Sequence, residues 1–128
     1  MSLRIEGQAL IFHFESEADL APESYAAELD RVLVPLSRKG KVGLMATFGD
    51  TVRVVPPSLV AFWLMRLRAP EVQLKFMVIV TTRLSLRIAV GGFARAARTF
   101  TDIEAIHLPT VEQARAWLQA RVDTGPPP

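Results

Sequence analysis

The feature that most constrains this chain is a regular alternation between short apolar runs and longer segments with helical spacing. The apolar runs at residues 42–48, 73–80 and 104–108 are typical of strands, and one helical segment separates each run from the next. Strands that alternate with single helices pair in parallel and are covered by those helices. The sequence therefore predicts an α/β domain built on a mostly parallel sheet.

Both ends of the chain extend this pattern. Residues 3–6 and 9–14 are short extended segments joined near Gly7, which predicts an N-terminal β-hairpin. Two further helices are expected, at residues 22–38 and 110–122.

Local signals set the expected limits of these helices and of the domain. Pro35 should bend or shorten the first helix, whereas Thr110 and Gln113 have the spacing of a capping box at the start of the last one. The tail at 124–128, TGPPP, cannot continue a helix and is expected to be disordered. A single domain over residues 1–123 is therefore predicted.

Composition excludes several classes of protein. The chain contains no cysteine, so disulfides, thiolate catalysis and cysteine-bound zinc are impossible. Its apolar runs are far shorter than the ~20 residues that a membrane-spanning helix needs, and its first residues show no signal-peptide pattern. We therefore expect a soluble, cytoplasmic protein without a transmembrane segment.

Charge is distributed unevenly along the chain, although the net charge is only +2. Residues 1–30 contain seven acidic side chains and a single basic one, Arg4, whereas residues 51–101 contain eight basic side chains and a single acidic one, Glu71. This asymmetry predicts an acidic side and a basic side of the folded molecule.

The order of the expected elements resembles the STAS fold, in its SpoIIAA-like branch of small bacterial proteins. The resemblance rests on the strand KFMVIVTT with the helix after it, on the short strand EAIHL, and on the closing helix PTVEQARAWLQARV. It covers residues 1–123 and implies a mixed, mostly parallel sheet with an N-terminal β-hairpin and about four helices. The family also implies a role in signalling, and its wider relatives include lipid-binding proteins.

A glycine pair in the segment 81–98, TTRLSLRIAVGGFARAAR, raises the question of a phosphate-binding loop. The segment lacks the third glycine of a dinucleotide fingerprint and the lysine of a P-loop. One apolar stripe at helical spacing passes through the glycines; it is formed by Leu86, Ala89, Val90, Phe93 and Ala97. We therefore predict a helix that continues across Gly91 and Gly92, with a break at the glycines as the alternative, and with Thr81 or Thr82 as its cap.

A second stripe on this helix is basic. It consists of Arg83, Arg87 and Arg98, with Arg95 at its edge. A solvated face is one interpretation. The other is contact with an anionic surface, either an acidic protein or a membrane, whereas nucleic acid is not expected because no aromatic side chains alternate with the arginines.

The segment 57–69 is apolar on two sides. One side, with Val60, Trp63, Leu64 and Leu67, can cover the sheet. Because a sheet buries only one side of a helix, the other side predicts contact with a partner protein or a second copy of the chain. The predicted interface residues are Ala61, Phe62, Met65, Arg66, Arg68 and Ala69. The alternative is that neighbouring helices or the segment 49–57 cover Phe62 and Met65.

The STAS resemblance also implies a phosphorylated serine in a turn before this helix. That turn aligns with residues 56–59, where Pro56 and Pro57 replace the acidic residue and the acceptor serine. Ser58, one position away, and Thr51, upstream, are the remaining candidate phosphoacceptors.

Side chains that could support catalysis or bind a metal are few. His13 and His107 each lie in an expected strand without other ligands at metal-binding spacing, and Glu15, Glu17 and Asp19 are interpreted as a solvated loop. We therefore predict no catalytic residue, no metal and no cofactor.

These observations lead to one main hypothesis and one alternative. The main hypothesis is a non-enzymatic, STAS-like regulatory or scaffolding domain that acts through protein–protein contact, homodimerisation included, by its helix at 57–69. The alternative is a module that binds a small ligand or a lipid.

Overall fold

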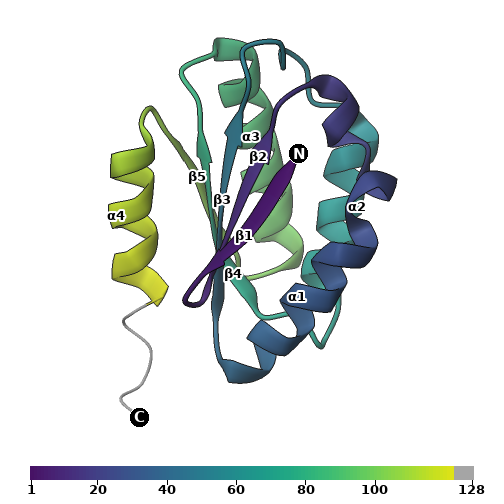
Figure 1. Ribbon diagram of the computed structural model, residues 1–128, viewed down its shortest axis with the longest axis vertical. Helices are drawn as coiled ribbons and strands as arrows, with labels where there is room; N and C mark the ends of the chain where they lie inside the picture. The colour runs from purple at the N-terminus through teal and green to yellow at the C-terminus, as the bar shows by residue number, and fades with distance from the viewer. Residues whose placement is uncertain (123–128) are drawn as a thin grey trace.

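A computed structural model describes residues 1–122 of the chain, apart from the side chain of Phe100. The tail predicted at 124–128 lies outside the described residues. Five strands form one sheet, and their spatial order is their order in the sequence (Figure 1). The strands are β1 (Ser2–Glu6), β2 (Ala9–Phe14), β3 (Val42–Phe48), β4 (Leu74–Val80) and β5 (Glu104–Leu108).

Strand β1 pairs antiparallel with β2, and every other neighbouring pair of strands is parallel. The four α-helices are α1 (Ala26–Lys39), α2 (Pro57–Arg68), α3 (Leu84–Phe100) and α4 (Val111–Val122), and two short 3-10 helices, η1 (Glu17–Leu20) and η2 (Pro22–Ser24), precede α1. The predicted fold class, a mixed and mostly parallel sheet with an N-terminal hairpin and four helices, is confirmed.

The topology decides where the helices lie. Each parallel crossover from β2 to β5 moves one strand further in the same direction, so crossovers of one hand carry their helices to one face of the sheet. Figure 1 shows α1, α2 and α3 on that face and α4 alone on the other. Two cores of unequal size follow, and the larger lies under α1, α2 and α3.

Glycine is required at the turn of the N-terminal hairpin. Gly7 has a φ of 60°, which is the conformation that the first residue of a two-residue hairpin turn adopts and that side chains with a Cβ disfavour. The register that results pairs Glu6 with Ala9 and carries the apolar residues of β2 into the sheet.

The first helix differs from its prediction at its start. Pro22 begins a separate 3-10 turn, so α1 starts at Ala26 instead of residue 22. Pro35 lies inside α1, and the helix continues beyond it to Lys39, so the predicted shortening is wrong.

Helix α3 crosses the glycine pair without interruption, as its apolar periodicity predicts. The predicted threonine cap is wrong. The residue at the N-cap is Arg83, and no side-chain cap bond is present there. Instead, the Thr81 hydroxyl accepts a hydrogen bond from the backbone N–H of Arg83 (3.1 Å), which fixes the turn just before the helix. At the last helix, by contrast, the Thr110 hydroxyl does accept from the N–H of Gln113 (3.2 Å).

Candidate functional site

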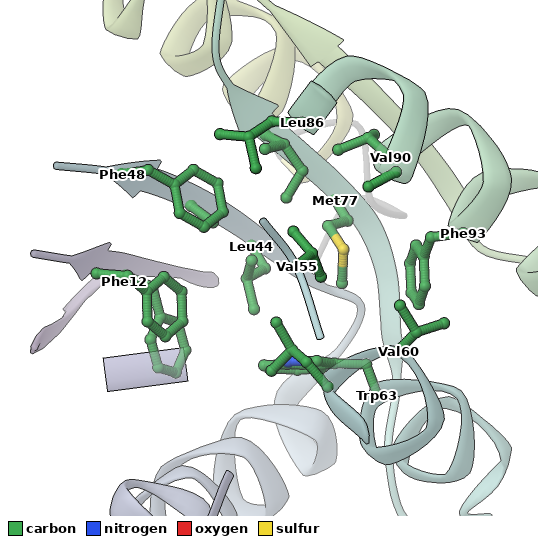
Figure 2. A pocket seen from close by; sticks show the side chains of 15 residues that line it. Phe12, Leu44, Phe48, Val55, Val60, Trp63, Met77, Leu86, Val90 and Phe93 are labelled. Atoms are coloured by element: carbon green, nitrogen blue, oxygen red, sulfur yellow. The ribbon is translucent and has the colours of Figure 1, made fainter. Parts of the chain in front are cut away.

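An apolar chamber of about 70 Å³ lies between the sheet and the helices α2 and α3 (Figure 2). The central strands β2, β3 and β4 form its floor, the two helices form its walls, and the segment between β3 and α2 closes one side. Its lining consists of Phe12, Phe14, Leu44, Ala46, Phe48, Val55, Leu59, Val60, Trp63, Met77, Ile79, Leu86, Ala89, Val90 and Phe93.

The side chains that line the chamber offer almost nothing to a polar group. All of them are hydrocarbon, thioether or aromatic, and the one N–H among them, on the Trp63 indole, already donates to the hydroxyl of Tyr25 (3.2 Å). A polar group without a partner is costly to bury, so such a chamber stays dry and admits apolar groups. Cavities of ~150 Å³ with a similar lining hold one benzene molecule, so this chamber has room for a short piece of hydrocarbon.

One side of the chamber lies where α2 and α3 approach each other. Val60 on α2 and Phe93 on α3 meet at this side of the chamber (Figure 2). Both side chains are half-buried, as are those of Val55 and Ala89, whereas the deeper residue Leu44 is buried. The side chains that meet at this seam are apolar, so no hydrogen bond joins them across it.

The segment at 49–56, which precedes α2, is fastened to the start of α3. The guanidinium of Arg83 donates hydrogen bonds to the carbonyls of Asp50 and Val52, and the Ser85 hydroxyl donates to the carbonyl of Arg53 (2.8 Å). Val52 is completely buried beneath these contacts. Arg83, predicted as a contact for an anionic partner, therefore has an intramolecular role, and its contact with such a partner stays a prediction.

The other predicted arginines differ in their surroundings. Arg87 and Arg95 are exposed on α3, and Arg98 is exposed while its Nε donates to the carbonyl of Ala94 (3.3 Å). Two large apolar side chains, Leu84 and Ile88, are exposed on the same helix. Helical periodicity could have predicted that Leu84 and Ile88 are exposed beside the arginines, because both residues fall outside the buried apolar stripe of α3.

The predicted interface on α2 is partly covered by the rest of the domain. Phe62 packs against the rings of Tyr25 and Trp63, and Arg66 lies over the Phe62 ring and pairs with Asp30 of α1. In the rest of the predicted set, Ala69 packs against the core, whereas Ala61, Met65 and Arg68 are exposed.

The candidate phosphoacceptors are both accessible. Ser58 is exposed in the first turn of α2, and Thr51 is exposed while its hydroxyl donates to the carbonyl of Glu15 (3.1 Å). Phosphorylation of either residue stays a prediction.

The two histidines do not come together. His13 contacts the Thr47 hydroxyl (2.7 Å) and the Glu15 carboxylate (2.5 Å) at the carboxyl ends of β2 and β3, whereas His107 lies half-buried on β5. Within residues 1–122, no three histidine, aspartate or glutamate side chains are grouped closely enough to hold a metal ion.

No helix within the described part of the chain is long and apolar enough to cross a bilayer. No protein-family model matches the chain, and neither a curated protein nor a solved structure matches it. The relationship to STAS proteins therefore remains a hypothesis, and the chamber and the surfaces around it are the features that bear on the function.

Proposed function

We propose that this chain is a non-enzymatic binding domain that holds an apolar chain, such as the acyl chain of a lipid, between the sheet and the helices α2 and α3. The observation that carries the proposal is the chamber, whose lining is apolar throughout. Its size fits the end of such a chain, and a longer stretch would enter as α2 and α3 move apart.

The energetic cost of unfilled space in a protein interior supports the same function. Protein interiors are close-packed, and an unfilled cavity lowers stability by roughly 24 cal/mol for each Å³. For a chamber of about 70 Å³ the cost would be at most about 1.7 kcal/mol, the value for a fully enclosed cavity. A hydrocarbon segment in the chamber would recover much of this free energy and would add the burial of its own surface.

The test is the binding of cis-parinaric acid, a fluorescent fatty acid, to the delipidated protein. Ala89 lies in the lining on α3, so Ala89→Phe places a ring in the chamber, whereas Ala61→Phe adds the same ring to an exposed position on α2. We expect saturable fluorescence enhancement for the wild type and for Ala61→Phe, and at least tenfold weaker binding for Ala89→Phe. Equal binding by all three proteins, or no binding by the wild type, would refute the proposal.

A second function, contact with a partner protein or a second copy of the chain through α2, is favoured by one observation. Met65 is 75 % exposed on the side of α2 that faces away from the sheet, and the exposed Ala61 lies one helical turn before it. A regulatory or scaffolding role of the STAS type would use such a surface.

Light scattering coupled to size-exclusion chromatography tests this second function for the homodimer. If α2 forms the interface, the wild type elutes as a dimer and Met65→Asp elutes as a monomer, while Val111→Asp, on the opposite face of the sheet, leaves the dimer intact. A wild type that remains monomeric at high concentration would exclude the homodimer.

A further inference from the structure

Three large aliphatic side chains are exposed in the first turns of α3 and in the segment that is hydrogen-bonded to its start. They are Val54, Leu84 and Ile88, with exposed fractions of 63 %, 68 % and 65 %. Leu84 and Ile88 are one helical turn apart on the same face of α3. Val54 belongs to the segment that is bonded to α3, since the carbonyl of its neighbour Arg53 accepts a hydrogen bond from the Ser85 hydroxyl.

Basic side chains surround this aliphatic group. Arg53 and Arg87 are exposed beside it, and Arg95 is exposed on the same helix. Two acidic side chains are also close: Asp50 lies 3.9 Å from the guanidinium of Arg83, and Glu17 accepts a hydrogen bond from the N–H of Arg53. Helix α3 itself contains no acidic residue, so the surface remains positive.

At the glycine pair no side chain projects from the outer side of α3. A Cβ added to Gly91 or to Gly92 would meet no other atom within 4 Å, so both glycines border open space. A broad, flat surface can therefore approach the helix backbone between Ile88 and Arg95.

We infer that this surface, formed by Val54, Leu84 and Ile88 with Arg53, Arg87 and Arg95, docks on a membrane that contains anionic lipids. Aliphatic side chains of an interfacial helix enter the acyl boundary, while arginines bind the phosphates of the headgroups. The combination of exposed aliphatic side chains with arginines on one helix is typical of helices that lie at a membrane surface. The inference goes beyond the ligand proposed above, because docking needs only the outer side of these residues.

The experiment is flotation with vesicles of phosphatidylcholine, either alone or with phosphatidylserine at about one third of the lipid, at low and at high salt. We expect the wild type to float only with the anionic vesicles and to be released by salt, because headgroup attraction is screened. Absence of flotation at low salt would overturn the inference. Retention on a polyglutamate column without flotation would overturn it as well and would assign the surface to an acidic protein.

Two variants test the surface, each with a matched control. Leu84→Ser/Ile88→Ser should weaken the binding at least tenfold, and Arg87→Glu at least fivefold, since each basic residue contributes about that factor. Val111→Ser on α4 and Arg31→Glu on α1 change exposed residues elsewhere and should float like the wild type. Unchanged flotation of the first two variants would contradict the inference, provided that circular dichroism shows all four proteins folded.

The ligand and the membrane are tested separately. Ala89→Phe changes the chamber and leaves the exposed residues in place, so it should still float with anionic vesicles. Flotation without parinaric acid binding would refute only the ligand, and binding of parinaric acid without flotation would refute only the docking surface.

Discussion

At the scale of single residues, Tyr25 connects the start of α1 to the main core. Its side chain is 1 % exposed, its ring packs against those of Phe12 and Phe14, and its hydroxyl accepts the hydrogen bond of the Trp63 indole. Burial raises the pKa of Tyr25 to about 12, although the indole N–H acts in the opposite direction. The phenol is thus held in its neutral form in the folded protein.

The raised pKa of Tyr25 predicts how stability depends on pH. The unfolded chain releases the phenol proton near pH 10, so the folded state binds more protons between pH 10 and about 12. The contribution of Tyr25 to the free energy of unfolding is therefore fully present below pH 10. About 2 to 3 kcal/mol of it is lost as pH rises towards 12.

Absorbance at 295 nm measures this titration directly, because Tyr25 is the only tyrosine in the chain. We expect a midpoint near 12 in the folded protein and near 10 in urea. A folded-state midpoint near 10 would show that the Tyr25 hydroxyl is in contact with water.

At the scale of elements, α3 is a continuous helix that carries two glycines in its interior. Each glycine costs a helix up to ~1 kcal/mol relative to alanine, and a Cβ at Gly91 or Gly92 meets open space. Gly91→Ala/Gly92→Ala should therefore raise the free energy of unfolding by ~1 to 2 kcal/mol, as measured by urea denaturation. A loss of stability would mean that α3 bends at the pair.

Gly43 on β3 is the opposite case. A Cβ there would overlap Cδ1 of Leu118, because α4 packs directly on the backbone of β3. We expect Gly43→Ala to lower the free energy of unfolding by ~1 to 3 kcal/mol in the same urea experiment. A neutral result would indicate that Leu118 can move aside and that α4 is loosely held.

The elements differ in how far the sequence predicts them. Helical phase identified α3, including its passage through Gly91, because a repeat of 3.6 residues depends only on local sequence. The same reasoning left open whether other parts of the chain cover the second side of α2. One contact that covers Phe62 comes from Tyr25, which precedes α1 and is far away in the sequence.

At the scale of the whole molecule, the order of the strands places the chamber. The crossovers carry α1, α2 and α3 to one face, and the seam between α2 and α3 lies over the central strands (Figure 1). The sequence predicted each of these apolar segments, but the chamber is lined by three strands, two helices and a connecting segment. A cavity of this kind arises from imperfect packing between segments that are distant in the sequence. The periodicity of each segment alone cannot predict it.

The same arrangement separates two faces of the molecule. The chamber and the proposed membrane-docking surface share the segment before α2 and the first turns of α3, whereas α4 packs on the other face of the sheet (Figure 1). This placement gives the two tryptophans different environments. Trp63 lines the chamber, and Trp117 lies on α4 beneath the guanidinium of Arg121.

Quenching of tryptophan fluorescence by a fatty acid brominated at its terminal carbon tests whether an apolar chain enters the chamber, because bromine quenches on contact. The chain has two tryptophans, so Trp117→Phe leaves Trp63 as the single reporter and Trp63→Phe leaves Trp117. If an apolar chain enters the chamber, the brominated fatty acid quenches Trp63 in a saturable manner and leaves Trp117 unchanged. Equal quenching of both tryptophans, or quenching of Trp117 alone, would contradict the proposed function.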